Sequence, residues 1–395
     1  MKPRCLFVGD GCCATGFARM NHAYIDGLLP TWDVHMLALN YDGDPHRYPF
    51  PVYPTSTRMQ VDRWGTQRLP ILVTHLRPDI IVVVNDPWNF PPYLARVGTT
   101  PVVGSIAVDG ANCRGTSLNG LRHAIFWTHY GVNQARLGGY TGPASIVPLG
   151  VDLSVYHPTE QAESRRRIGL PAQLRGSDTF IVGVGGRNHP RKRFDLALIY
   201  FAKWIKEAKI QNAYLFVHEG PTGDTGYDLD QLAQYLQIHN RIIISKPEMG
   251  QGMHEEHLKY VYGALDVMLS TATGEGWGLM HMEGMACGIP QILPDWSALG
   301  EWAADAACMV PCTSVVCTPN NINALGGVPD EAKTVRALDL VYRNPQYRAS
   351  LAEKGLALVQ RPEFRWEAIG AQFEETLTQC LSPLILEQVP SEATA

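Results

Sequence analysis

Short apolar runs alternate with segments of helical periodicity along the first part of the chain. A strand-like run at residues 4–9 leads into a glycine-rich turn and a predicted helix at 17–28, where Phe17, Met20 and Tyr24 share one face. Further strands are predicted at 34–39, 79–84, 102–107, 124–128 and 145–148. The run at 79–84 is apolar on both faces, as in a central strand. This alternation predicts a parallel sheet covered by helices on both sides.

The same pattern restarts after a polar, proline-marked passage at 151–178, which we interpret as a candidate linker. Its three consecutive arginines, Arg165 to Arg167, are expected on one solvated helix face. Strands are then predicted at 180–186, 213–218, 241–245, 265–269 and 289–293. A last periodic segment at 365–381 predicts a helix with Trp366, Ile369 and Phe373 on one face.

Composition narrows the class of protein. A length of 395 residues suggests two domains. The net charge of -5 argues against a protein dominated by nonspecific DNA affinity. With no run of eighteen apolar residues and a strand pattern that starts at once, neither a membrane span nor a signal peptide is predicted, and a cytoplasmic location is expected. The nine cysteines include no CxxC pair, and the spacing of Cys308, Cys312 and Cys317 fits no common zinc motif.

The stretch from Gly263 to Pro294 holds the most chemical information. A strand ends in a loop with three alternating glycines, from which a helix begins near Leu279. Such a turn offers free N–H groups and the positive end of a helix to an anion. Glu275 and Glu283 would repel a phosphate but suit sugar hydroxyls. The stretch therefore predicts a sugar-nucleotide site; the alternative is that Glu275 caps the helix and Glu283 lies on its solvated face.

A second turn, at residues 185–195, concentrates positive charge. Four cations, at positions 187, 191, 192 and 193, follow a buried strand and a double glycine and precede a helix that starts near Asp195. Diphosphate is the natural counter-charge; the alternative is a solvated basic turn. Both turns follow strands of one predicted sheet, so they can converge at its carboxyl edge.

Glu275 and Glu283, with seven residues between them in GEGWGLMHMEGMACGIPQI, resemble the signature of the retaining GT-B glycosyltransferases that include sucrose synthase and bacterial mannosyltransferases. The segments TGFAR (15–19), PLGVDLSVYHP (148–158), GGRNHPRKRFD (185–195) and FRWEAIGAQF (364–373) are also similar to that family. The resemblance implies an α/β GT-B fold with two Rossmann-like domains facing a cleft. Residues 1–170 would bind the acceptor and 171–364 the nucleotide sugar, 365–381 would cross back to the first domain, and 382–395 would be a flexible tail.

The resemblance also implies roles for single residues. Arg187 and Lys192 would bind the donor diphosphate, Glu275 the transferred sugar and Glu283 the ribose hydroxyls. Asp109 stands where many members carry a His after the strand at 102–107, so its role towards sugar or acceptor is open. Further donor contacts are expected from the loop and turn residues Gly16, Gly186, Gly276, Trp277, Gly278 and Leu279.

The implied reaction is the retaining transfer of a glucose-like hexosyl unit from a nucleotide-diphosphate sugar, expected to be a UDP sugar, to a hydroxyl acceptor. A front-face mechanism needs neither metal nor cofactor, because the departing phosphate oxygen takes the acceptor proton. The acceptor, which could be a glycan, a lipid-linked sugar, a small molecule or modified DNA, is not identified by the sequence. One alternative is a phage-type glucosyltransferase that acts on hydroxymethylated DNA bases, with Arg58, Arg63, Arg68, Arg77 and Arg114 along a groove. Others are a sugar-nucleotide epimerase and a non-catalytic nucleotide-sugar-binding protein.

Overall fold

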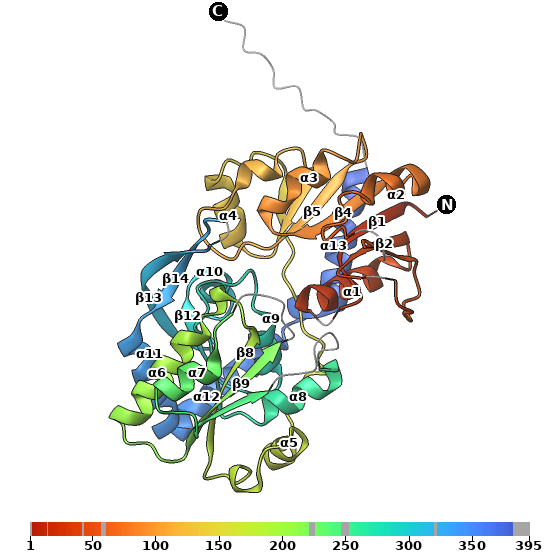
Figure 1. Cartoon of the computed structure of the whole chain (residues 1–395). Helices are drawn as coiled ribbons and strands as arrows, with labels where there is room; N and C mark the ends of the chain where they lie inside the picture. The colour runs from red at the N-terminus through yellow and green to blue at the C-terminus, as the bar shows by residue number, and fades with distance from the viewer. Residues whose placement is uncertain are drawn as a thin grey trace, which may run out of the picture.

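A computed structural model describes residues 2–13, 15–41, 43–56, 61–220, 226–245, 253–319 and 322–381. The predicted tail at 382–395 and Arg58 lie outside these residues. Figure 1 shows two α/β domains, with the N-terminal strands and helices in one and the strands from β8 onwards in the other. No helix among the described residues is long and apolar enough to cross a membrane.

The first domain contains a seven-stranded sheet in the order β3-β2-β1-β4-β5-β6-β7. All of its strand pairs are parallel, as the alternating pattern predicts. The strands are β1 (Arg4–Asp10), β2 (Asp33–Leu39), β3 (Val52–Pro54), β4 (Ile80–Asn85), β5 (Val102–Ile106), β6 (His123–Phe126) and β7 (Ala144–Ile146). Its helices are α1 (Gly16–Leu28), α2 (Leu69–Leu76), α3 (Phe90–Leu94) and α4 (His129–Leu137). Strand β4 is buried along its whole length, which explains why every residue before its last, Asn85, is apolar.

The second domain repeats the arrangement with the order β10-β9-β8-β11-β12-β13-β14, of which only β14 is antiparallel to its neighbour. The strands are β8 (Phe180–Arg187), β9 (Ala213–Gly220), β10 (Ile242–Ser245), β11 (Val267–Leu269), β12 (Gln291–Asp295), β13 (Cys308–Cys317) and β14 (Leu325–Pro329). The helices are α5 (Gln161–Arg167), α6 (Phe194–Glu207), α7 (Leu229–Tyr235), α8 (Glu255–Gly263), α9 (Leu279–Ala286), α10 (Ser297–Trp302), α11 (Glu331–Arg343) and α12 (Pro345–Val359). The β13–β14 hairpin reaches the first domain, where Ala111 and Leu325 exchange two backbone hydrogen bonds of 2.9 Å.

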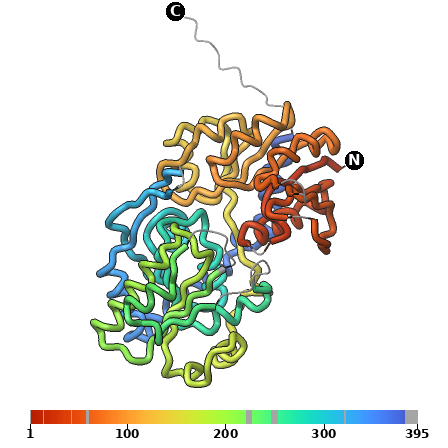
Figure 2. The backbone as a smooth tube through the Cα atoms, viewed as in Figure 1, coloured from red at the N-terminus to blue at the C-terminus, as the bar shows by residue number. Residues whose placement is uncertain are grey.

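The last helix, α13 (Trp366–Leu381), returns to the first domain and packs against α1. Figure 2 shows this return as the blue tube beside the red N-terminal segment. Tyr24 stacks on Phe373 with ring centroids 4.2 Å apart. A Cβ atom at Gly27 would lie 2.9 Å from the Cα of Gly370, so these two glycines let the helix backbones touch.

Arg165 corrects the prediction of a solvated arginine face on α5. Its side chain is fully buried and donates to the carbonyl oxygens of Ala264, Gly176 and Thr179 and to Asp266. Arg166 and Arg167 are exposed and pair with Glu163, as expected for a surface helix. Although α5 precedes the boundary predicted at 170, its contacts are with α8 of the second domain.

Candidate functional site

The carboxyl edges of the two sheets lie against each other. The loop between β11 and α9 contacts the first domain directly: a Cβ atom at Gly276 would lie 3.1 Å from both the Ala107 Cβ and the Trp127 ring. A Cβ atom at Gly274 would clash with the Asp109 carbonyl oxygen, so there is no room for a side chain. The glycines of this loop thus permit the close approach of the two domains.

Glu275 is held between two cations of the basic turn. Its Oε1 lies 2.5 Å from Lys192 Nζ and its Oε2 lies 3.0 Å from Arg191 Nη1. The Glu275 side chain is only 7% exposed, and its backbone N–H donates to Ser297. Burial acts to raise the pKa of Glu275, but Lys192 and Arg191 outweigh it and lower the pKa to about 2. Glu275 is therefore an ionised, fixed acceptor of hydrogen bonds in the cleft and not a helix cap.

Arg191 connects the two domains. Its Nε lies 3.0 Å from Asp109 Oδ2 while its Nη1 donates to Gly274 and Glu275. The 3₁₀ turn Pro190–Lys192 places it there, ended by Arg193 in the left-handed region with φ 50°. In the sequence Arg191 is one of the four cations of the turn, and no separate role is predicted for it.

Arg187 and Lys192, predicted to act as a pair, face different partners. Arg187 ends β8, and its charge acts to lower the pKa of Asp10 and Asp86 in the first domain. Burial nevertheless raises the pKa of both carboxyls, and for Asp86 the neighbouring Asp109 raises it further. Lys192 instead lies on Glu275, and burial lowers its own pKa.

Glu283 is buried inside α9, so the alternative that it lies on a solvated face is wrong. Its Oε1 lies 2.6 Å from Arg19 Nη2 on α1, and its Oε2 accepts from the Tyr262 hydroxyl at 2.5 Å. Arg19 also approaches Glu255 at 3.6 Å. The first domain thus contributes a cation to the carboxylate expected to bind the ribose.

The glycine loops adopt the backbone that the site requires. Gly278 precedes α9 in the left-handed region with φ 92°, and Gly186 has φ 125° beside the Lys192 side chain. Gly16 begins α1 opposite Leu279, whose Cδ1 would lie 3.3 Å from an added Cβ. Gly16 therefore faces the start of α9, as the sequence predicts for the opposing loop.

Trp277 has a structural role that the sequence did not reveal. Its ring is buried and stacks on Trp302 with centroids 5.4 Å apart. Its carbonyl oxygen accepts from Trp302 Nε1 at 2.7 Å. These contacts fix the loop just before α9, so the expected backbone contacts of Trp277 to the donor stay a prediction.

Part of the chain is similar to a known protein family. Residues 170–355, which include Arg187, Lys192, Glu275 and Glu283, match the family Glycosyl transferases group 1. The match covers slightly less than half of the chain. The D-inositol 3-phosphate glycosyltransferase of Stackebrandtia nassauensis is 28% identical over 250 residues, which are 60% of this chain and 50% of the relative. Its counterpart in Rhodococcus jostii is 29% identical over 246 residues, covering 60% and 48%. The chain spans about half the length of these relatives.

Solved structures share the fold over nearly the whole chain. Sucrose-phosphate synthase from Thermosynechococcus elongatus has a TM-score of 0.72 at 18% identity, covering 96% of this chain and 99% of that one. Anabaena Alr3699/HepE in complex with UDP and glucose has a TM-score of 0.70 at 16% identity, covering 95% and 100%. The predicted GT-B fold is confirmed.

The cleft includes four side chains that the sequence did not single out, namely Asp10, Arg19, Asp86 and Arg191. Arg19 lies in the TGFAR segment and Asp86 directly after the most apolar strand, so a weak signal existed for both. What the sequence could not give is the pairing across the domains, because it joins positions that are far apart in the chain.

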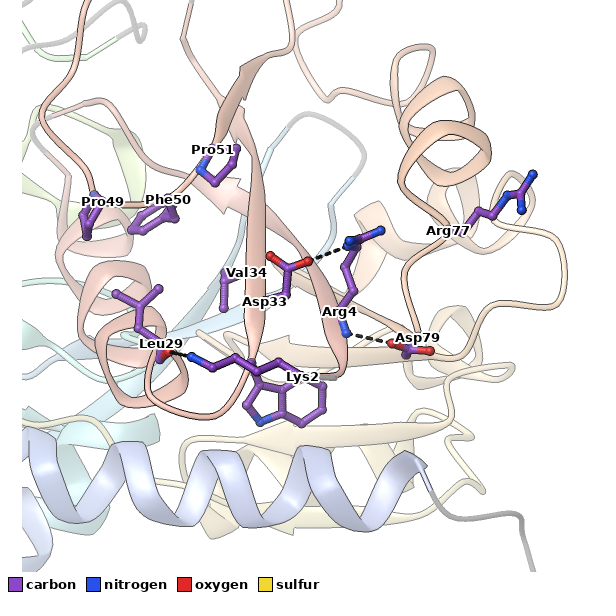
Figure 3. A pocket seen from close by; sticks show the side chains of 11 residues that line it. Lys2, Arg4, Leu29, Asp33, Val34, Pro49, Phe50, Pro51, Arg77 and Asp79 are labelled. Atoms are coloured by element: carbon purple, nitrogen blue, oxygen red, sulfur yellow. Dashed lines mark hydrogen bonds and ion pairs between the residues drawn. The ribbon is translucent and has the colours of Figure 1, made fainter.

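Two other features that the sequence raised are the arginines considered for a DNA groove and the cysteine cluster. The arginines considered for a DNA groove do not line up: Arg77 lies before β4, at the amino edge of the sheet, whereas Arg114 follows β5 at the carboxyl edge. Arg77 borders a pocket of about 590 Å³ there, whose charged groups Lys2, Arg4, Asp33 and Asp79 bond to one another or to the backbone (Figure 3). Within the described residues no three His, Cys, Asp or Glu side chains form a metal-binding group, and Cys308, Cys312 and Cys317 are spread along β13.

Proposed function

We propose that the protein is a retaining glycosyltransferase that moves a glucose-like hexosyl unit from a UDP sugar to a hydroxyl acceptor without a metal ion. The observation that supports this most is the position of Glu275, which is fixed between Lys192 and Arg191 at the start of α9 and faces Asp109 of the other domain. An ionised carboxylate between cations suits a ligand that carries both hydroxyl groups and phosphates.

The donor lies along the carboxyl edge of the second sheet in this proposal. Arg187, Lys192 and the N-terminal end of α9 bind the diphosphate, because each offers positive charge or free N–H groups. Glu275 accepts from hydroxyls of the transferred sugar and Glu283 from the ribose. The choice of UDP and glucose is supported by the Anabaena protein of the same fold, whose complex contains UDP and glucose.

Transfer then depends on orientation and charge. The acceptor hydroxyl approaches from the first domain and attacks the anomeric carbon on the face that the diphosphate leaves. The departing phosphate oxygen takes the hydroxyl proton, while the cations stabilise the charge that develops on the diphosphate. The close approach of Gly274 and Gly276 to the first domain limits the access of water and so disfavours hydrolysis.

Product analysis tests this proposal. The protein is incubated with UDP-, GDP- and TDP-hexoses and a mixed acceptor pool, with and without EDTA, and hydrolysis, transfer and epimer formation are followed. We expect transfer that is unaffected by EDTA, with the anomeric configuration of the donor preserved in the NMR spectrum of the product. Inverted products, EDTA-sensitive turnover, epimers alone or binding without turnover would each contradict the proposal. Glycosylation of hydroxymethylated duplex DNA would instead select the DNA-modifying alternative.

A further inference from the structure

The carboxyl edge of the first sheet carries a carboxylate at each of its three central strands. Asp10 ends β1, Asp86 directly follows β4, and Asp109 lies in the segment after β5. These strands are neighbours in the sheet. Burial raises the pKa of Asp86, and the charges of Asp109 and Asp10 raise it further, as expected for carboxylates that follow neighbouring strands. We call these three residues the acidic edge.

The cations that act on the acidic edge come from the other domain. Arg187 and Arg191 lower the pKa of Asp86, and Arg187 does so for Asp10. Arg191 is already bound to Asp109 and Glu275. Under the proposed function Arg187 binds the donor diphosphate. A bound donor therefore removes counter-charge from Asp10 and Asp86 and adds negative phosphates beside them.

Asp86 is also left able to accept hydrogen bonds. Among the described residues no hydrogen-bond donor contacts its carboxylate, and the residue is only partly exposed. Asp10 by contrast accepts from the Thr15 hydroxyl at 2.8 Å and from Asn40 at 3.0 Å. A partly buried carboxylate without a protein donor can accept hydrogen bonds from the hydroxyl or ammonium groups of a ligand.

We propose that the acceptor is a neutral or amine-bearing polyol and not a phosphate ester, and that the acidic edge sets this selectivity. The inference rests on the proposed function, since it places the acceptor opposite the donor. Hydroxyl and ammonium groups donate to Asp10 and Asp86, whereas a phosphate dianion is repelled by the carboxylates and by the donor diphosphate. Selectivity thus arises from a repulsive element as well as from attraction.

One cation of the first domain, Arg47, would act against the repulsion of a phosphate by the acidic edge. Arg47 lies next to Tyr48, which stacks on His22 at 4.0 Å and donates to the Gly11 carbonyl oxygen at 3.4 Å. The Arg47 side chain is exposed, so solvent and salt screen its field, whereas the largely buried Asp86 is screened much less.

Matched acceptor pairs test the inference. Glucose with glucose 6-phosphate, glucosamine with glucosamine 6-phosphate, and myo-inositol with its 3-phosphate are each offered with the nucleotide sugar that the enzyme turns over. Within the pairs that are glycosylated, kcat/KM for the unphosphorylated member should be at least about tenfold higher. Equal or better use of the phosphorylated member overturns the inference, as does donor hydrolysis without transfer to any member. Absence of both hydrolysis and transfer overturns the proposed function instead.

Variants identify the acidic edge as the cause. Asp86→Asn and Asp10→Asn should each raise the ratio of kcat/KM for the phosphorylated over the unphosphorylated acceptor by about tenfold. The ratio is measured on one preparation, so a partial loss of folded enzyme cancels. The matched control is Asp305→Asn, which removes an exposed carboxylate of the second domain and should leave the ratio unchanged. An unchanged ratio in both acidic-edge variants overturns the assignment.

Discussion

Glu275 and Asp86 are both largely buried carboxylates at carboxyl ends of central strands, one in each domain, yet their pKa values move in opposite directions. Glu275 has two cations within 3.0 Å, and its pKa falls to about 2. Asp86 has Asp109 as its strongest charged neighbour, and its pKa rises. In the second domain, proposed to bind the donor, Glu275 is thus already paired with cations, whereas Asp86 in the first domain has no hydrogen-bond donor on its carboxylate among the described residues.

The opposite pKa shifts of Glu275 and Asp86 suggest a different role for each domain in the proposed reaction. A preorganised set of charges costs no reorganisation when the diphosphate leaves, so it belongs on the donor side. The first domain, which binds the acceptor in our proposal, needs selectivity more than charge stabilisation. Asp10 and Asp86 would provide this selectivity by repelling anionic acceptors. Arg191 contacts carboxylates in both domains, Asp109 in the first and Glu275 in the second.

The largest effect is expected from Lys192→Ala. The change removes one of the two cations beside Glu275, so that this carboxylate is less compensated by cations, as Asp86 is. The variant removes a cation from the donor diphosphate and a partner from Glu275. We expect kcat to fall about 10³-fold, about 4 kcal/mol of transition-state stabilisation, because removing one preorganised donor typically costs that much. Steady-state transfer rates and thermal unfolding of the variant measure this. Arg166→Ala, which changes an exposed arginine, is the control; a rate within a few-fold of the parent protein would sink the role of Lys192.

A smaller effect is expected from Arg165→Ala, which tests charge compensation in the second domain away from the cleft. The change leaves Asp266 and several carbonyl oxygens without their buried partner. We expect a loss of about 3 kcal/mol in the free energy of unfolding, as for other broken buried pairs. Urea unfolding checks this, with the neighbouring Arg166→Ala expected to show no measurable change. Equal stabilities of the two variants would contradict the burial of Arg165.

The residues proposed to bind the donor were easier to identify from the sequence than the acidic edge, for a physical reason. Glu275, Glu283 and Lys192 lie in contiguous turns whose glycines and charges form local patterns. The acidic edge is assembled from three strands, each of which contributes a single aspartate that is unremarkable in the sequence. Arg165 shows the same limit, because three consecutive arginines look alike until tertiary contacts bury one of them. The fold itself was readable, since strand and helix periods are local properties.

The smallest effect, and the most direct test of the contrast, is the pH dependence of Asp86→Asn. Burial and Asp109 raise the pKa of Asp86 from 3.8 to about 7 in the folded protein, despite Arg191 and Arg187. A raised carboxyl pKa means that the folded state binds more protons, so this contribution to stability is fully present below pH 3.8 and is lost as the pH rises to about 7. Asparagine removes that loss. The free energy of unfolding of the variant, relative to the parent protein, should therefore increase by at least about 1 kcal/mol between pH 4 and pH 8. Urea unfolding at the two pH values measures this, and Asp305→Asn should show no such trend. If the free energy of unfolding of the variant relative to the parent protein stays constant or falls as the pH rises, then cations compensate Asp86 as they compensate Glu275.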